Sequence, residues 1–196
     1  DKMNVDLYEV IRAAETKPFG FVPYYPGPGL GGHCIPIDPF YLTWKAREFG
    51  MHTRFIELAG EINSSMPQYV IDKITWALNN VNKPLKKSKL LILGLGYKKN
   101  VDDMRESPSV DIIKLLLERG STVDYSDPFF PEFPNIRKLI FQKKSVNITK
   151  DLLGQYDAVI LCSDHDSFDY KLIEEASKLI IDTRGRYPTS DKIIRA

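Results

Sequence analysis

The sequence predicts an α/β protein in two parts, a helical first part followed by a part built on a parallel sheet. Up to about residue 83, apolar residues recur at the three- and four-residue spacing of amphipathic helices. After residue 88, short apolar runs alternate with helical patterns. This alternation is typical of βαβ units, whose strands run parallel. We therefore place the boundary between the two parts within residues 83–88.

The length and composition are those of a globular chain with one domain or slightly more. Of the 196 residues, 43% are hydrophobic and 27% are charged, and the formal net charge is +1. Such a balance provides no basic surface for nucleic acid. No apolar run approaches the roughly 20 residues that cross a bilayer, and no signal peptide opens the chain, so we expect a cytoplasmic protein with no membrane partner. The two cysteines are too few for a disulfide scaffold.

The first stretch of the chain is expected to form a helix that ends near Glu15. Its apolar residues at helical spacing are Val5, Tyr8, Ile11 and Ala14. Asn4 and Asp6 are the alternative N-caps, because a short polar side chain can accept a hydrogen bond from the first turn. Since the chain begins without Met and apparently inside this pattern, we expect it to be a piece of a longer protein.

Two further helices follow in the first part. One has Asp38 as its expected N-cap, Pro39 at its first position and Gly50 just past its end. The other covers residues 54–81, and Pro67 is expected to kink or divide it. Apolar residues occupy more than one face of this long helix, which indicates a partner such as a second subunit.

The second part is expected to contain five strands and two helices. The strands are Leu90–Leu93, Thr122–Tyr125, Val146–Ile148, Ala158–Cys162 and Leu179–Ile181. One helix is capped by Ser107-Pro108 and ends at Gly120, and the other covers Tyr170–Ser177. Together they predict a parallel sheet with helices between its strands.

Residues 17–39 are too rich in proline and glycine for regular structure and predict a long functional loop. Glycines let backbone N–H groups approach a ligand closely. Cys34 lies near the start of the following helix, where the helix dipole favours the nucleophilic thiolate. Asp38, about one turn away, could orient a water molecule or accept a proton. The alternative is a rigid loop with a buried cysteine and an ordinary capping aspartate.

The run from Lys17 through Glu48, whose specific core is Gly-Gly-His-Cys-Ile-Pro-Ile-Asp at residues 31–38, resembles the catalytic loop of the UDP-glucose/GDP-mannose dehydrogenase family, most closely its UDP-N-acetylglucosamine 6-dehydrogenases. The resemblance continues along the chain through residues 94–99, 105–107, 125–128 and 182–184. It therefore covers essentially the whole sequence.

The resemblance implies an NAD-dependent, four-electron oxidation of a UDP-sugar C6 alcohol to a carboxylate, a reaction of polysaccharide biosynthesis. Cys34 would capture the intermediate aldehyde as a thiohemiacetal, which a second hydride transfer converts into a thioester. Asp38 would assist the water that hydrolyses this thioester. Covalent capture prevents escape of the aldehyde and divides one difficult step into easier ones.

The resemblance also implies binding roles for residues outside the thiol motif. The implied substrate-binding residues are Tyr24, Tyr25, Gly29, Gly31, Gly32, Tyr97 and Lys98. Arg105 and Arg184 match arginines near the cofactor and the sugar. For each of these arginines, lysines and tyrosines, the alternative is a solvated cation or an ordinary loop aromatic.

The sequence departs from the family pattern in ways that refine the expectation. The UDP-glucose branch has Ser and Lys where this chain has His33 and Ile37, which favours a UDP-N-acetylhexosamine over UDP-glucose. The family's N-terminal NAD-binding domain is missing. The chain is therefore expected to be the C-terminal part of the enzyme, inactive alone. Residues 1–84 are its central dimerisation region, with the helix 54–81 at a homodimer interface, and residues 85–196 are a Rossmann-like UDP-sugar-binding domain.

The segment Gly94-Leu95-Gly96 has only the beginning of a dinucleotide-binding fingerprint. Its third glycine position holds Lys99, whose bulk opposes close packing of helix and strand, and the next helix starts only near Ser107. No helix N-terminus therefore directly receives a pyrophosphate. We expect this domain to bind the UDP end of the substrate rather than NAD.

Weaker candidates and alternative functions remain. Asp164-His165-Asp166 and the His33–Cys34 pair are poor metal motifs, since neither has evident further ligands, and Cys162 is expected to be an inert core thiol. A non-catalytic UDP-sugar-binding and dimerisation module, a UDP-glucose 6-dehydrogenase and an independent thiol enzyme are the alternative functions. The last would pair Cys34 with a histidine, for which the sequence identifies no orienting third group.

Overall fold

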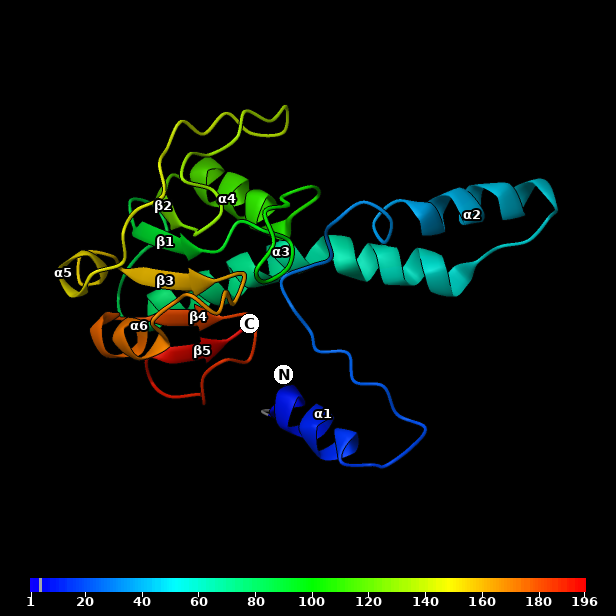
Figure 1. The fold of residues 1–196 in the computed structure, drawn as a ribbon, viewed down its shortest axis with the longest axis horizontal. Helices are drawn as coiled ribbons and strands as arrows, with labels where there is room; N and C mark the ends of the chain where they lie inside the picture. The colour runs from blue at the N-terminus through cyan, green and yellow to red at the C-terminus, as the bar shows by residue number, and fades with distance from the viewer. Residues whose placement is uncertain (4) are drawn as a thin grey trace.

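The computed structural model describes residues 1–3 and 5–196 and shows an α/β body from which a pair of helices projects (Figure 1). The first helix, α1 (Leu7–Glu15), lies beside the body, and the pair consists of α2 (Asp38–Glu48) and α3 (Arg54–Asn80). The expected first helix is thus confirmed, with Asp6 as its N-cap. Asn4, the alternative cap, lies outside the described residues.

Five parallel strands form the sheet of the body, in the order β2-β1-β3-β4-β5. They are β1 (Lys89–Leu93), β2 (Thr122–Ser126), β3 (Ala158–Leu161), β4 (Ile180–Asp182) and β5 (Ile193–Arg195). The register pairs Leu93 with both Ser126 and Leu161, and Leu161 with Asp182. The carboxyl ends of these strands therefore share one edge, which is where ligands bind in open α/β sheets.

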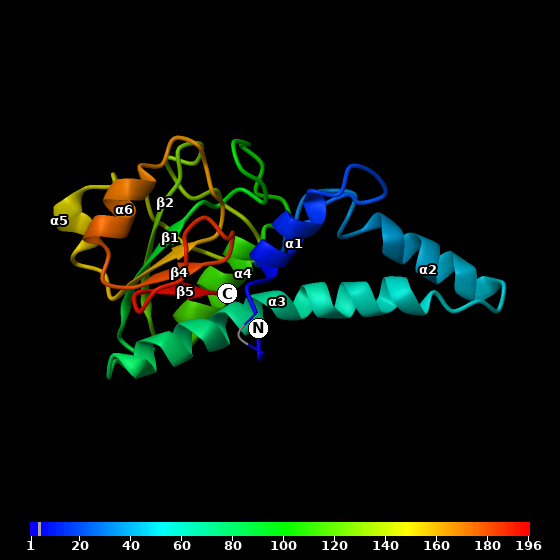
Figure 2. The same ribbon diagram turned by 90° about the horizontal axis from the view of Figure 1, so that it is seen from below.

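Helices cover both faces of the sheet (Figures 1 and 2). On one face, the second half of α3 and α4 (Pro108–Glu118) pack against alternate residues of the strands, such as Leu90 and Ile160. On the other face, α5 (Lys150–Leu153) and α6 (Tyr170–Ala176) pack against the intervening residues, such as Leu91 and Leu161. Both faces being buried explains why the strands read as continuous apolar runs.

The projecting helices α2 and α3 pack closely against each other. Gly60 of α3 allows this contact, because a Cβ there would lie 2.2 Å from the ring of Phe40 in α2. The predicted terminating role of Gly50 is confirmed. Its φ is +72°, and the N–H groups of Gly50 and Met51 donate to the carbonyls of Arg47 and Ala46, which is the Schellman arrangement.

Several predicted elements are confirmed and others are wrong. Four of the predicted strands exist with ends shifted by one residue, but Val146–Ile148 is not a strand. The Val146 N–H donates to the carbonyl of Tyr125 in β2, but the described residues that follow Val146 form no further backbone hydrogen bonds to β2. The strand β5 was not predicted. Asp38 is the first helical residue rather than the N-cap, which is Ile37.

Pro67 lies within α3 without dividing it. A proline removes the hydrogen bond to the carbonyl four residues earlier, here that of Asn63. This carbonyl faces the chain near Gly29, since a Cβ on Gly29 would lie 3.7 Å from it. Figure 2 shows that α3 changes direction near its middle, between the part that projects with α2 and the part that lies against the body. Among the described residues, no helix combines the length and apolar character that a membrane span requires.

Candidate functional site

The glycine loop, residues 26–34, lies across the carboxyl edge of the sheet, and its glycines are required by close contacts. A Cβ on Gly31 would lie 2.5 Å from the Cβ of Tyr97 and 2.8 Å from the carbonyl oxygen of Glu106. A Cβ on Gly32, whose φ is +95°, would lie 3.1 Å from the Tyr97 ring. The loop is thus seated directly on the segments that follow β1.

Three hydrogen bonds anchor the glycine loop to different elements. The Gly32 N–H donates to the Arg105 carbonyl at 2.8 Å, and the Leu30 N–H donates to Oδ1 of Asn63 in α3 at 2.8 Å. The buried Tyr8 hydroxyl lies 3.0 Å from the carbonyl oxygens of both Pro26 and Thr183. The loop is therefore fixed relative to α3, α1 and the sheet.

Cys34 ends the glycine loop and is exposed, so the alternative of a rigid loop with a buried cysteine is wrong. Its carbonyl accepts hydrogen bonds from the N–H groups of Ile37 and Asp38, at 3.1 and 2.8 Å, and so begins the first turn of α2. The neighbouring His33 has its Nδ1 3.8 Å from the Cys34 sulfur. The thiol and the exposed Asp38 carboxylate thus belong to one turn that faces solvent.

The guanidinium of Arg105 is held by Asp103, with Nη2 2.7 Å from the carboxylate, and this hydrogen bond raises the pKa of Arg105. Arg105 also lies near Cys34, which adds slightly to the raised pKa of Arg105. Arg184 follows β4 and donates from Nε to the Cys162 carbonyl at 2.6 Å. Its Nη1 lies under Gly27, 2.7 Å from where a Cβ would stand.

The other predicted binding residues lie at different depths. Tyr97 is half-buried under the loop, whereas Lys98 is exposed and its amine forms no ion pair within the part of the chain that the structure describes. Tyr25 stacks on Tyr8 at 6.1 Å between ring centroids and donates to Glu15 at 2.6 Å. Tyr24 is 84% exposed. The structure brings Tyr97, Arg105 and Arg184 against the glycine loop, while Tyr24 stands apart.

A cavity of about 360 Å³ lies beside the thiol turn. It is lined by residues of the glycine loop, of the start of α4 and of the segment after β2: Gly32, His33, Ile37, Met104, Arg105, Glu106, Ser107, Val110, Ile136, Arg137 and Lys138. Arg137 and Lys138 were not predicted as site residues. The sequence does show two adjacent cations in a loop at this position. Two cations that only face solvent would give the same sequence pattern. Lys138 pairs with Asp111 at 2.8 Å, so the charge of Arg137 is the one that suits an anionic ligand.

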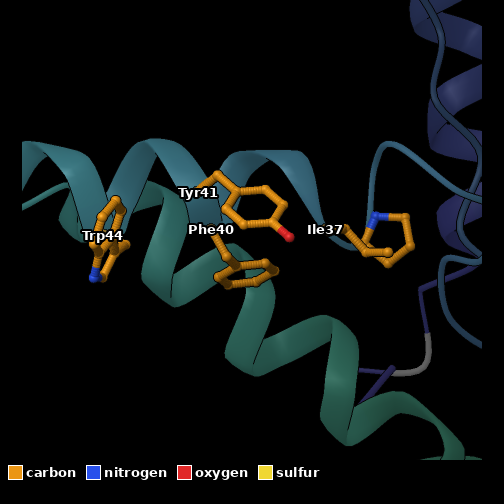
Figure 3. A pocket seen from close by; sticks show the side chains of 5 residues that line it. Ile37, Phe40, Tyr41 and Trp44 are labelled. Atoms are coloured by element: carbon orange, nitrogen blue, oxygen red, sulfur yellow. The ribbon is translucent and has the colours of Figure 1, made fainter.

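A second cavity, of about 530 Å³, is apolar and lies at the start of α2 (Figure 3). Figure 3 shows its labelled side chains, Ile37, Phe40, Tyr41 and Trp44, gathered along the first turns of that helix. All four are exposed. An exposed apolar cluster of this kind is typical of a contact with another protein surface rather than of a chemical centre.

The weaker candidates also have defined positions. His165 is fully buried, and Asp166 is bound at the surface by Lys99 and Asn100. No group of three or more possible metal ligands occurs among residues 1–3 and 5–196. Cys162 is buried, as predicted, and burial raises the pKa of its thiol to about 12. The segment after Gly94-Leu95-Gly96 reaches its first helical residue only at Pro108.

The fold and the site together define an α/β protein in which a glycine loop and an exposed thiol lie at the carboxyl edge of a parallel sheet. Residues 91–189 match the profile of the UDP-glucose/GDP-mannose dehydrogenase family, UDP binding domain, and residues 1–65 match that of the family's central domain. The chain belongs to the UDP-glucose/GDP-mannose dehydrogenase family.

Relatives of known activity match most of this chain but are much longer. A UDP-N-acetyl-D-mannosamine dehydrogenase of Methanococcus maripaludis is 35% identical over 170 residues, which are 86% of this chain and 36% of the relative. A UDP-N-acetyl-D-glucosamine 6-dehydrogenase of Pseudomonas aeruginosa is 32% identical over 179 residues, covering 91% of this chain and 41% of the relative. The chain thus spans less than half the length of these two relatives.

Solved structures give the same result. The UDP-D-ManNAc dehydrogenase of Pyrococcus horikoshii superposes with a TM-score of 0.80 at 26% identity, over 99% of this chain and 44% of that one. The UDP-N-acetyl-mannosamine dehydrogenase of Staphylococcus aureus superposes with a TM-score of 0.71 at 28% identity, again over 99% of this chain and 44% of that one. The predicted family and the mixed α/β fold with a parallel sheet are confirmed.

Proposed function

We propose that this chain is the C-terminal part of an NAD-dependent UDP-N-acetylhexosamine 6-dehydrogenase. It binds the UDP-sugar at the carboxyl edge of the sheet and presents Cys34 to the sugar C6. The observation that carries this proposal is an exposed cysteine at the end of a glycine loop seated on that edge. The activities named for the relatives support the substrate class.

The proposed chemistry of this chain consists of a thiol addition and a hydrolysis. The Cys34 sulfur adds to the C6 carbon of the aldehyde and the thiol proton passes to the aldehyde oxygen, which gives a thiohemiacetal. Oxidation of that carbon by two electrons leaves a thioester on Cys34. Water then adds to the thioester carbonyl, Asp38 accepts a proton from it, and the carbon–sulfur bond breaks to release the carboxylate and the free thiol.

The glycine turn after β1 does not fit a dinucleotide. The N–H groups of Leu95 and Gly96 already donate to the carboxylate of Asp127, at 2.6 and 3.4 Å. We therefore place NAD outside this turn, in the part of the longer protein that precedes these residues. NAD would serve as the hydride acceptor of both oxidations. Arg105 and Arg184 are proposed to approach it from this chain.

The remaining residues have proposed binding roles. Lys98 is free to meet the diphosphate or sugar, and Tyr97 supports the glycine loop from below. Tyr24, Tyr25, Gly29, Gly31 and Gly32 belong to the segment proposed to enclose the nucleotide sugar. Each role is testable by a single substitution, because none of these side chains belongs to the main apolar cores.

We also propose the predicted division into a central region, residues 1–84, and a UDP-sugar-binding domain, residues 85–196. The first half of α3 would form a homodimer, since Phe55, Leu58 and Ile62 on it are exposed, Phe55 at 89%. The two free thiols favour the cytosol, where disulfides are rare.

The test is titration of the purified chain with UDP-N-acetylglucosamine, UDP-N-acetylmannosamine and UDP-glucose in a calorimeter, with GDP-mannose as the control. We expect binding of the two UDP-N-acetylhexosamines and weaker binding of the others. The longer protein, given NAD and the same sugars, should form the carboxylate with two NADH per sugar, and its Cys34→Ala variant should form no carboxylate. Binding without turnover in the longer protein would support the non-catalytic module instead, and no binding of any UDP-sugar would contradict the proposal.

A further inference from the structure

The crevice between the ends of β1 and β3 is occupied by two buried polar side chains of the protein itself. In the strand order β2-β1-β3, the chain turns in opposite directions from β1 and from β3, and such a switch point is the usual ligand crevice of an open α/β sheet. Here Asp127, just after β2, and His165, after β3, fill it with relative exposures of 4% and 0%. A buried charge and a buried imidazole are costly unless every polar atom is bound.

Asp127 uses both carboxylate oxygens. Its Oδ2 accepts from the Leu95 N–H at 2.6 Å and lies 3.2 Å from Nε2 of His165, while its Oδ1 accepts from the Phe129 N–H at 2.8 Å. Burial alone would raise the pKa of Asp127, but these hydrogen bonds outweigh burial and lower it. The side chain is therefore a carboxylate bound to the turn after β1.

His165 uses both ring nitrogens. Its Nδ1 lies 2.9 Å from the backbone nitrogen of Asn100 and can only accept from that N–H group. Nε2 must then carry the proton and donate to Asp127. The ring is enclosed by Phe129 and Phe168, at 5.3 and 5.4 Å between centroids. One neutral tautomer thus satisfies every polar atom of the ring.

The pair holds the segment 95–100 at both of its ends. Asp127 binds the N–H of Leu95, and His165 binds the N–H of Asn100. Between these two points lie Tyr97, whose side chain contacts Gly31 and Gly32, and Lys98, whose amine is exposed. The place of both residues, and through Tyr97 the seating of the glycine loop, therefore depends on the buried pair together with two surface contacts: the Asn100 side chain with Asp166, and the Tyr97 N–H with the Asp103 carbonyl at 3.1 Å.

We propose that Asp127 and His165 are positioning residues, which fix Lys98 for the UDP-sugar and hold Tyr97 beneath the glycine loop that ends at Cys34. The proposal rests on the proposed function for the part that concerns Lys98. The part that concerns the glycine loop is independent of any ligand.

Two replacements of His165 separate its two contacts. In His165→Asn, the amide oxygen can take the place of Nδ1 and keep the hydrogen bond from Asn100. In His165→Gln, the amide nitrogen can take the place of Nε2 and keep the hydrogen bond to Asp127. Amide hydrogen exchange followed by mass spectrometry should show faster exchange in segment 95–100 and in the glycine loop for His165→Gln. Strands β1 and β3 should remain protected. Unchanged exchange in the glycine loop of His165→Gln would overturn the proposal. Exchange at Asn100 that is as fast in His165→Asn as in His165→Gln would also overturn it, because His165→Asn keeps the hydrogen bond from Asn100.

A double-mutant cycle tests the role of Lys98. We expect His165→Gln to weaken binding of UDP-N-acetylglucosamine about tenfold, on the order of one buried hydrogen bond. In the Lys98→Ala background, the same change should have less than about a twofold effect. Lys99→Ala is the matched control, because Lys99 is a neighbouring exposed cation that pairs with Asp166 at the surface.

The outcomes of the cycle are distinct. Loss of the His165 effect in Lys98→Ala, with the full effect kept in Lys99→Ala, supports positioning. Equal effects in all three backgrounds would mean that His165 only stabilises the fold and would overturn the role of Lys98. If the unaltered chain binds no UDP-sugar, the proposed function and the role of Lys98 both fail, and the exchange experiment still decides whether the pair seats the glycine loop.

Discussion

Replacement of Gly31 by alanine is expected to unseat the glycine loop. The added Cβ would stand 2.5 Å from the Cβ of Tyr97, 2.8 Å from the carbonyl oxygen of Glu106 and 3.2 Å from the Glu106 carbonyl carbon. None of these atoms can rotate away, because each belongs to the main chain or is bonded directly to it. The φ of Gly31 is not positive, so an alanine there would cause no backbone strain and its expected cost is steric.

The magnitude follows from the depth of the overlap. Adding a carbon to a close-packed contact costs about 1–3 kcal/mol. If the loop lifts instead, it loses the hydrogen bond from the Gly32 N–H to the Arg105 carbonyl, worth about 0.5–1.5 kcal/mol, and its packing on Tyr97. Since about 1.4 kcal/mol is a factor of ten, UDP-sugar affinity should fall roughly 5- to 150-fold.

The assay is calorimetric titration with UDP-N-acetylglucosamine, together with urea unfolding, on Gly31→Ala and on a control. Gly154→Ala is the matched control, because its Cβ would meet its nearest neighbour at 3.6 Å, an ordinary contact, and its φ is −63°. The control should bind as the unaltered chain does. Equal affinity and equal unfolding free energy for Gly31→Ala would refute the seating of the loop on Tyr97.

Three further predictions concern the free energy of unfolding, measured in urea. Tyr8→Phe should lose about 1 kcal/mol, since two backbone carbonyls lose their donor, whereas exposed Tyr25→Phe should change it by less than about 0.5 kcal/mol. Ile74→Ala should lose about 2–5 kcal/mol because the second half of α3 lies in the core, and Ile140→Ala, 82% exposed, should lose almost nothing. The pKa of Asp127 lies below its ordinary 3.8. The stability that its carboxylate contributes is therefore complete above about pH 4 and is lost as the pH falls further. The Asp127→Asn variant should lack this acid-dependent loss of stability. Equal unfolding free energies for the two tyrosine variants, or for the two isoleucine variants, would contradict the contact concerned. The same loss of stability in acid for Asp127→Asn and the unaltered chain would contradict the role of the Asp127 carboxylate.

Much of the fold was predictable because local signals agreed with the packing. The strand at 89–93 is buried on both faces, so its apolar run was unambiguous. The helix after Ser107 has a capping hydroxyl, a proline in the first turn and a glycine after its end, and all three are found. The strand β5 was missed because its apolar run consists only of Ile193 and Ile194. Val146–Ile148 has the composition of a strand, but its backbone bonds to β2 at one point only.

The site was predictable where residues are adjacent in sequence and not where the fold brings them together. The thiol turn could be identified from residues 31–38 alone. The pairing of Asp127 with His165 could not, since 38 positions separate them and each resembles an ordinary loop residue. A signal did exist, because both follow predicted strands whose carboxyl ends meet in a parallel sheet. The placement of Asp38 was wrong by one residue, since the hydrogen bond from its N–H to the Cys34 carbonyl already starts the helix.

The most direct measurement is the rate at which iodoacetamide alkylates Cys34, followed by peptide mass spectrometry with and without UDP-N-acetylglucosamine. Cys162 is an internal control, because it is buried and should react only when the chain unfolds. If the sulfur lies in the sugar site, the ligand will slow alkylation of Cys34 in proportion to its occupancy, and UDP alone will slow it less. An alkylation rate that saturating UDP-sugar leaves unchanged, while calorimetry shows the ligand bound, would place Cys34 outside the site and contradict the proposed chemistry.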